Sequence, residues 1–113
     1  MCEQSTLNQL LHEIASYAKH CFGDDLESII LYGSYARGDA DEESDLDVMV
    51  LVRMTAQQLL AYRKQWNKFG TDLDLKYNLL TSCKLQDSET FHEWKQTLPF
   101  FRNVDQEGVR ISA

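Results

Sequence analysis

An unbroken apolar run from Val48 to Val52 constrains the fold of this chain more than any other segment. Side chains of a strand alternate between two faces, so a run that is apolar at every position predicts a strand buried on both faces. Such a strand needs cover above and below the sheet. The run therefore predicts the central strand of a domain in which helices pack against a small sheet.

The rest of the chain supplies elements that can cover this strand. Apolar residues at helical spacing predict a first helix, which follows a capping box at Thr6 and Gln9 and ends at Gly23. A second helix is predicted to begin at a capping box formed by Thr55 and Gln58. We expect Gly70 to interrupt that second helix before it ends at residue 78. Further segments are expected as strands at 28–32, 79–85 and 109–111, and as helical turns at 35–38, after residue 87 and from residue 99. The order predicts one α/β (α+β) domain over residues 1–113, with a small mixed β-sheet.

Charge and composition exclude several classes of function. Eleven Lys and Arg against 18 Asp and Glu give a net charge of −7, which suits divalent cations or a basic partner. The nearest basic cluster is Arg63, Lys64 and Lys68 on one helix, so we expect no direct DNA binding. No apolar segment approaches membrane-spanning length, and the three Cys show no metal-ligand spacing, so we expect a cytoplasmic protein. In a chain of 113 residues we expect no separate substrate domain.

Two aspartates at the start of the central strand indicate a metal site. Asp45 and Asp47 are two positions apart, so strand alternation directs both carboxylates to one face. Two adjacent carboxylates repel each other, and a bound divalent cation removes that repulsion. Hard oxygen ligands that are few in number suit Mg²⁺, or Mn²⁺, shared with the phosphates of a substrate.

A glycine and a serine precede this pair and indicate a phosphate site. Gly33 lets the backbone come close to a ligand, and Ser34 adds a hydroxyl where a strand meets a helical turn. Arg37 lies within reach either of a phosphate or of the acidic loop that follows, and both readings stay open. Phosphate and metal sites side by side are what nucleotidyl transfer from a nucleoside triphosphate requires.

At these residues the sequence resembles the polymerase β-like nucleotidyltransferase superfamily, and most closely its minimal nucleotidyltransferases. The pattern is Gly-Ser at 33–34, Ala-Arg-Gly at 36–38 and Ser-Asp-x-Asp at 44–47, and the likeness covers roughly residues 25 to 111. The resemblance implies that Asp45 and Asp47 are the catalytic, metal-binding pair. It implies that the nucleotide site includes Gly33, Ser34, Arg37 and Ser44.

The resemblance also implies a partner. Small proteins of this type often pair with a helical HEPN-type protein in toxin–antitoxin modules, in which the nucleotidyltransferase acts as antitoxin. We therefore expect transfer of a nucleotidyl group, with ATP the favoured donor among nucleoside triphosphates, to a hydroxyl of that partner. The alternative is a weak or inactive member of the family that neutralises the partner by binding alone.

One departure from the family pattern leaves the activity open. Active members carry a third carboxylate on the next core strand, and the strand expected at 79–85 places Ser82 at that position. A hydroxyl is a weak metal ligand and no useful base at neutral pH. Asp72 or Asp74 could supply the carboxylate if the strand began earlier, but a helical spacing over 73–77 disfavours this.

The remaining large or charged side chains receive ordinary interpretations. Lys84 is expected either to steady a triphosphate or to cover the sheet edge, and the two readings are not separated. The aromatic residues of the second half are expected mainly in the core: Trp66, Phe91, Trp94, Phe100 and Phe101.

Overall fold

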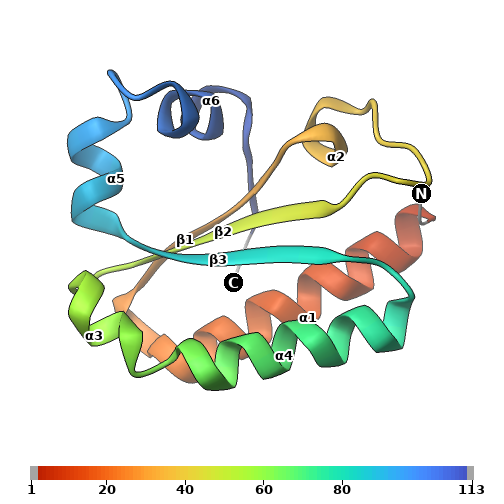
Figure 1. Ribbon diagram of the computed structural model, residues 1–113, viewed down its shortest axis with the longest axis horizontal. Helices are drawn as coiled ribbons and strands as arrows, with labels where there is room; N and C mark the ends of the chain where they lie inside the picture. The colour runs from red at the N-terminus through yellow and green to blue at the C-terminus, as the bar shows by residue number, and fades with distance from the viewer. Residues whose placement is uncertain (1–2, 112–113) are drawn as a thin grey trace.

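Strand β2 (Leu46–Val52) lies inside a four-stranded sheet in the computed structural model, which describes residues 3–111 (Figure 1). The strand order is β3-β2-β1-β4, with β1 at Leu26–Tyr32, β3 at Thr81–Asp87 and β4 at Val109–Ile111. Strand β1 pairs antiparallel with β2 and with β4, whereas β3 pairs parallel with β2. The prediction of an α+β domain with a small mixed sheet is confirmed.

Helices cover both faces of the sheet, as Figure 1 shows. One face packs on α1 (Gln4–Phe22) and α4 (Arg63–Tyr77), and the fully buried Val48 and Val50 point into that layer. The other face packs on α5 (Ser88–Trp94) and α6 (Pro99–Glu107), where Met49 and Leu51 join a second cluster. The shorter elements are η1 (Gly23–Asp25), α2 (Ser34–Arg37) and α3 (Ala56–Leu60). Within residues 3–111 no helix combines the length and hydrophobicity that crossing a membrane requires.

Several predicted helix ends are confirmed. Thr55 and Gln58 form the expected capping box at the start of α3. Asn78 ends α4 in the left-handed conformation with φ 51°, and Gly23 ends α1 with φ 54°. The Asp87 side chain accepts a hydrogen bond from the Thr90 amide and so caps α5. Each of these signals involves residues close in sequence, so it does not depend on tertiary packing.

Two predictions about the helices are wrong. Helix α1 begins at Gln4 with Glu3 as its N-cap, so Thr6 lies inside the helix and forms no capping box with Gln9. Helix α4 continues through Gly70, and the break in the second helical region comes earlier, at residues 61–62 between α3 and α4. Burial of the Trp66 and Leu73 side chains of α4 in the core offsets the weak helix propensity of one glycine.

Strand β3 forms one edge of the sheet, and side chains of α4 bond to its outward backbone groups. The Leu46 amide donates to the Leu80 carbonyl, so the even-numbered residues of β3 turn their backbone groups toward β2 and the odd-numbered ones turn outward. The Asp74 carboxylate accepts hydrogen bonds from the amide and hydroxyl of Thr81, at 2.8 and 2.7 Å. The Trp66 indole donates to the Cys83 carbonyl at 3.0 Å. These bonds tie the edge strand to the helix layer.

Replacement of Asp74 by alanine is expected to destabilise the domain. The change leaves the Thr81 amide without its charged acceptor, which costs about 2 kcal/mol of the free energy of unfolding. Urea denaturation followed by circular dichroism measures it. Asp72→Ala is the matched control, because Asp72 makes only an exposed pair with Lys68 of the same helix, worth about 0.5 kcal/mol or less. Equal losses in the two variants would contradict a role for Asp74 at this edge.

Candidate functional site

The two predicted metal-binding aspartates lie where β2 begins. Asp47 is the second residue of β2, and Asp45 immediately precedes the strand. Burial raises the pKa of the Asp47 carboxyl, and the negative charge of Asp45 raises it further. Lys84 and Arg37 oppose both effects. Asp47 is therefore a partly buried carboxylate with a second carboxylate near enough to repel it.

Gly33 makes the closest approach to this pair. It follows β1 directly, with φ 74° and ψ −157°, a conformation that side chains of L-residues rarely adopt. A Cβ atom at this position would overlap the Oδ2 atom of Asp47. The missing side chain thus lets the Asp47 carboxylate pack against the backbone of Gly33, and any larger residue would both strain the turn and displace Asp47.

The residues present fit a cation that completes its coordination with substrate atoms. In the range 3–111 no group of three or more His, Cys, Asp and Glu side chains is arranged to hold a metal. Asp45 and Asp47 supply oxygen ligands only, which Mg²⁺ and Mn²⁺ accept. Ligands beyond these two would come from water and from phosphate.

The predicted phosphate-binding residues lie on α2 and the loop that follows it. Ser34 is the first residue of α2, whose Ala36 and Arg37 amides donate to the Gly33 carbonyl. The Arg37 guanidinium pairs with Asp39 at 3.3 Å and with Glu107 at 3.8 Å, and its side chain is 47% exposed. Exposed ion pairs of this kind contribute little, so Arg37 is able to exchange them for a phosphate.

Ser44 closes the acidic loop. Its hydroxyl accepts a hydrogen bond from the Asp41 amide at 2.9 Å and donates to the Asp41 carboxylate at 3.1 Å. These bonds fold residues 41–44 into a turn directly before Asp45. In this arrangement the Ser44 hydroxyl is engaged within the loop and orients the chain as it enters β2.

The register of β3 places Ser82 beside Asp47. The two residues are direct partners in the parallel pair, so their side chains share a face of the sheet. Asp74 lies on α4, where its carboxylate binds Thr81, and Asp72 pairs with Lys68 on the same helix. The structure therefore brings Ser82 to Asp47 and engages both alternative carboxylates elsewhere.

Two further side chains lie on the Asp47 face. Lys84 pairs in register with Met49, and its Nζ lies 5.1 Å from the centre of the Phe100 ring on α6. It therefore points over the face toward α6. Tyr32, which sequence reasoning missed, pairs in register with Asp47, and burial raises the pKa of its phenol to about 12. An antiparallel hairpin that joins the strand at 28–32 to the central strand through residues 33–45 would have placed Tyr32 beside Asp47.

Several expected core aromatics are exposed. Trp66 and Phe91 are buried as predicted and Phe101 is partly buried, but Trp94 and Phe100 are 42% and 45% exposed. The sheet of four strands is narrow, and α5 and α6 cover its far face with Phe91 and Val104 as their buried hydrophobic residues. Phe100 therefore remains at the rim of that layer, next to Lys84.

A family profile and several curated proteins resemble this chain. The profile described as "Nucleotidyltransferase domain" matches residues 11–103. Three proteins of Methanocaldococcus jannaschii are each named "putative protein adenylyltransferase". One is 46% identical, over 78% of this chain and 81% of its own length. Another is 32% identical, over 87% of this chain and 90% of its own length. The third is 51% identical over 45% of the chain, a match that spans 35% of that protein's length.

A solved structure also aligns with the chain. It is described as a putative nucleotidyltransferase from Sulfolobus solfataricus, and the alignment covers 96% of this chain and 87% of that one. The TM-score is 0.45 at 16% sequence identity, so this likeness adds nothing to the evidence from sequence.

Asp47→Asn is expected to stabilise the metal-free domain at neutral pH. Because folding raises the pKa of Asp47, the folded state holds this proton more tightly, and the carboxylate opposes folding once the pH exceeds that raised pKa. The gain in the free energy of unfolding should therefore shrink as the pH falls toward the ordinary value of 3.8. Urea titrations in EDTA between pH 4 and pH 7 measure this. Glu42→Gln, in the exposed loop, is the control, and a pH-independent gain would contradict the argument.

Proposed function

The chain belongs to the nucleotidyltransferase domain family, and from that premise we propose that it transfers AMP from ATP to a hydroxyl of a partner protein. The observation that carries the proposal is the close approach of Gly33 to Asp47, which places the Gly-Ser turn directly against a carboxylate pair. The Gly-Ser and Asp-x-Asp segments come together there because β1 and β2 are antiparallel neighbours.

The proposed reaction joins the hydroxyl oxygen of the acceptor to the α-phosphorus of ATP. The bond from that phosphorus to the oxygen that bridges the α- and β-phosphates breaks, and pyrophosphate leaves with the electron pair. The proton of the acceptor hydroxyl passes to solvent. The products are a phosphodiester between AMP and the partner, and pyrophosphate.

The residues of the chain would bind and orient the two reactants. Asp45 and Asp47 would hold Mg²⁺, which when bound supplies positive charge against the phosphate oxygens. Gly33 and Ser34 would hold the β- and γ-phosphates, and Arg37 would leave its exposed ion pairs for the triphosphate. Lys84, on the same face as Asp47, adds a cation toward which the departing pyrophosphate could move.

The acceptor is proposed to be a helical HEPN-type protein for which this chain is the antitoxin. Support comes from the resemblance of residues 33–47 to the minimal nucleotidyltransferases and from three relatives that are named for protein adenylylation.

A second candidate function is neutralisation of the same partner by binding alone. The observation that favours it is Ser82, which lies beside Asp47 where active relatives carry a third carboxylate. A hydroxyl there neither binds a cation strongly nor accepts the acceptor's proton at neutral pH. In this case the nucleotide site would be kept and transfer would be slow or absent.

The metal assignment predicts the behaviour of the double variant Asp45→Asn, Asp47→Asn. It should fold normally but lose the Mg²⁺-dependent part of its ATP affinity, since no charged ligand for the cation remains. Isothermal calorimetry with and without Mg²⁺ measures this. Glu42→Gln with Glu43→Gln is the control, because it removes two acidic charges from the adjacent exposed loop. Unchanged Mg²⁺-dependent affinity in the test variant would rule out the metal site.

Ser82→Asp should accelerate transfer of label from ATP to a partner co-purified from the native host. A third carboxylate would tighten cation binding and accept the acceptor's proton, help that contributes about 10²- to 10⁴-fold in enzymes. Ser82→Asn is the matched control, with similar size and no charge. If the wild type transfers label rapidly, Ser82→Ala leaves the rate unchanged and Asp74→Asn abolishes it, then Asp74 supplies the third carboxylate. No labelled product with any variant would favour neutralisation by binding.

A further inference from the structure

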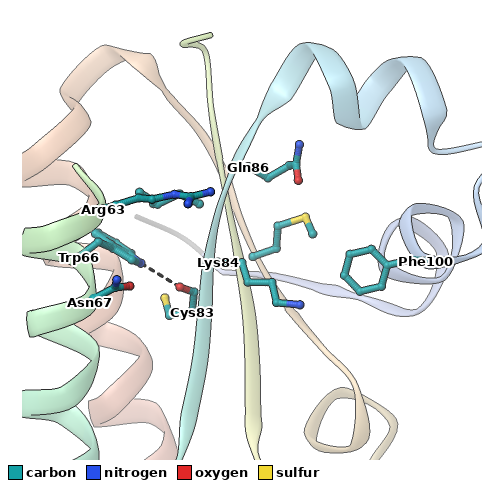
Figure 2. Close-up of a pocket in the computed structure, with 9 residues that line it drawn as sticks. Arg63, Trp66, Asn67, Cys83, Lys84, Gln86 and Phe100 are labelled. Carbon is teal, nitrogen blue, oxygen red and sulfur yellow. Dashed lines mark hydrogen bonds between the residues drawn. The ribbon is translucent and has the colours of Figure 1, made fainter. Parts of the chain in front are cut away.

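A hollow of about 350 Å³ opens at the outer edge of β3, between the two helical layers (Figure 2). Figure 2 shows Arg63, Trp66 and Asn67 reaching it from α4, and Phe100 from α6 on the opposite side. The strand itself runs between them, with Lys84 and Gln86 directed toward the α6 side.

The hollow belongs to a groove that follows the whole strand. A second hollow shares the Trp66 and Lys84 walls and extends to Ser82. A third shares the Arg63 and Gln86 walls and extends to Asp87. We call this continuous feature the β3 groove. One end reaches Ser82, the register partner of Asp47, and Gln86 lies four positions further along the strand, about 13 Å at 3.3 Å per residue.

The floor of the groove presents strand backbone. The odd-numbered residues of β3 turn their amides and carbonyls away from β2, and Asp74 and Trp66 already bond to groups of Thr81 and Cys83. The outward amide and carbonyl of Leu85 lie beyond these two bonds, in the part of the strand that lines the first and third hollows. An outward edge of this kind accepts another extended segment by main-chain hydrogen bonding.

The middle of the groove is basic although the chain is acidic. Arg63 and Lys84 are the charged residues that line the central hollow, one on each side of the strand, whereas the chain carries a net charge of −7. The acidic residues lie at the two ends of the groove, where Asp74 binds Thr81 and Asp87 binds Thr90. The central hollow therefore attracts acidic side chains, and the exposed ring of Phe100 offers an apolar contact beside them.

We propose that the β3 groove binds an extended, acidic segment of the acceptor protein, which pairs with the outward backbone groups of Leu85 on β3 and brings its hydroxyl to the end at Ser82. The proposal rests on the proposed transfer to a protein hydroxyl and names the kind of segment that is recognised. A second copy of this chain is a poor occupant, because symmetric pairing of two β3 edges would set Arg63 and Lys84 against their own copies.

The test uses a fluorescein-labelled peptide, Glu-Glu-Tyr repeated three times, with the intact chain and without ATP or Mg²⁺. Fluorescence anisotropy should show binding, whereas the matching Lys-Lys-Tyr peptide, which the net charge would favour, should bind at least tenfold more weakly. Arg63→Glu should weaken binding of the acidic peptide tenfold or more. Lys64→Glu is the matched control, with the same change of charge on the neighbouring exposed residue outside the groove.

A second measurement locates the bound peptide. Hydrogen exchange of the Leu85 amide should slow when the acidic peptide binds, because the amide gains a main-chain acceptor. Circular dichroism checks that Arg63→Glu folds, and Arg63→Ala serves in its place if it does not. Absent binding, equal weakening by Lys64→Glu, unchanged exchange at Leu85, or a concentration-dependent dimer that Arg63→Glu abolishes would each overturn the proposal.

The outcome is separable from that of the proposed function. Peptide binding without nucleotide does not depend on transfer. Peptide binding with no labelled product would therefore support the groove as a binding site and contradict the proposed transferase activity. Labelled product formed from ATP at the same KM for the partner in Arg63→Glu and wild type would retain the transferase and reject the groove.

Discussion

The candidate site depends on the close approach of a side-chain-free residue to a partly buried carboxylate. Gly33 leaves β1 with a positive φ and lies against Asp47, the β2 residue that pairs with Tyr32. Antiparallel pairing brings these two points of the chain together, and the buried apolar residues of β2 hold the pairing in register. A one-residue slip would turn Asp47 into the α1–α4 core, so the same contacts that stabilise the sheet also orient the carboxylate.

Much of this was predictable because it depends on local rules. The apolar run at 48–52 indicated a doubly covered strand, and strand alternation directed Asp45 and Asp47 to one side. The turn at Gly33 needed only a residue that tolerates positive φ. The position of Ser82 required more, since β3 begins two residues later than expected, at Thr81. A start two residues later does not change which residues of the strand face each side of the sheet, so Ser82 still faces the same side as Asp47.

The features that sequence reasoning missed are those set by packing between distant segments. Helix α4 runs through Gly70 because Trp66 and Leu73 anchor it in the core on either side. The Asp74 carboxylate binds Thr81 across a tight turn, a role that the spacing of acidic residues does not reveal. Phe100 and Trp94 are exposed because the number of aromatic residues in the second half exceeds what a narrow sheet and two short helices can bury.

The absence of a third carboxylate changes the charge of the exposed β3 edge, because the parallel pairing with β2 places that position, Ser82, on β3. A third carboxylate at Ser82 would stand beside two others and add repulsion that only a bound cation relieves. A serine there removes that repulsion and leaves Lys84, two residues along, as the nearest charged side chain of β3 on this face. The middle of the edge consequently carries positive charge, in a chain that is acidic overall. An acidic segment that approaches along this strand is therefore attracted at Lys84, whereas the carboxylates of Asp45 and Asp47 repel it at the end of the strand until a bound cation offsets their charge.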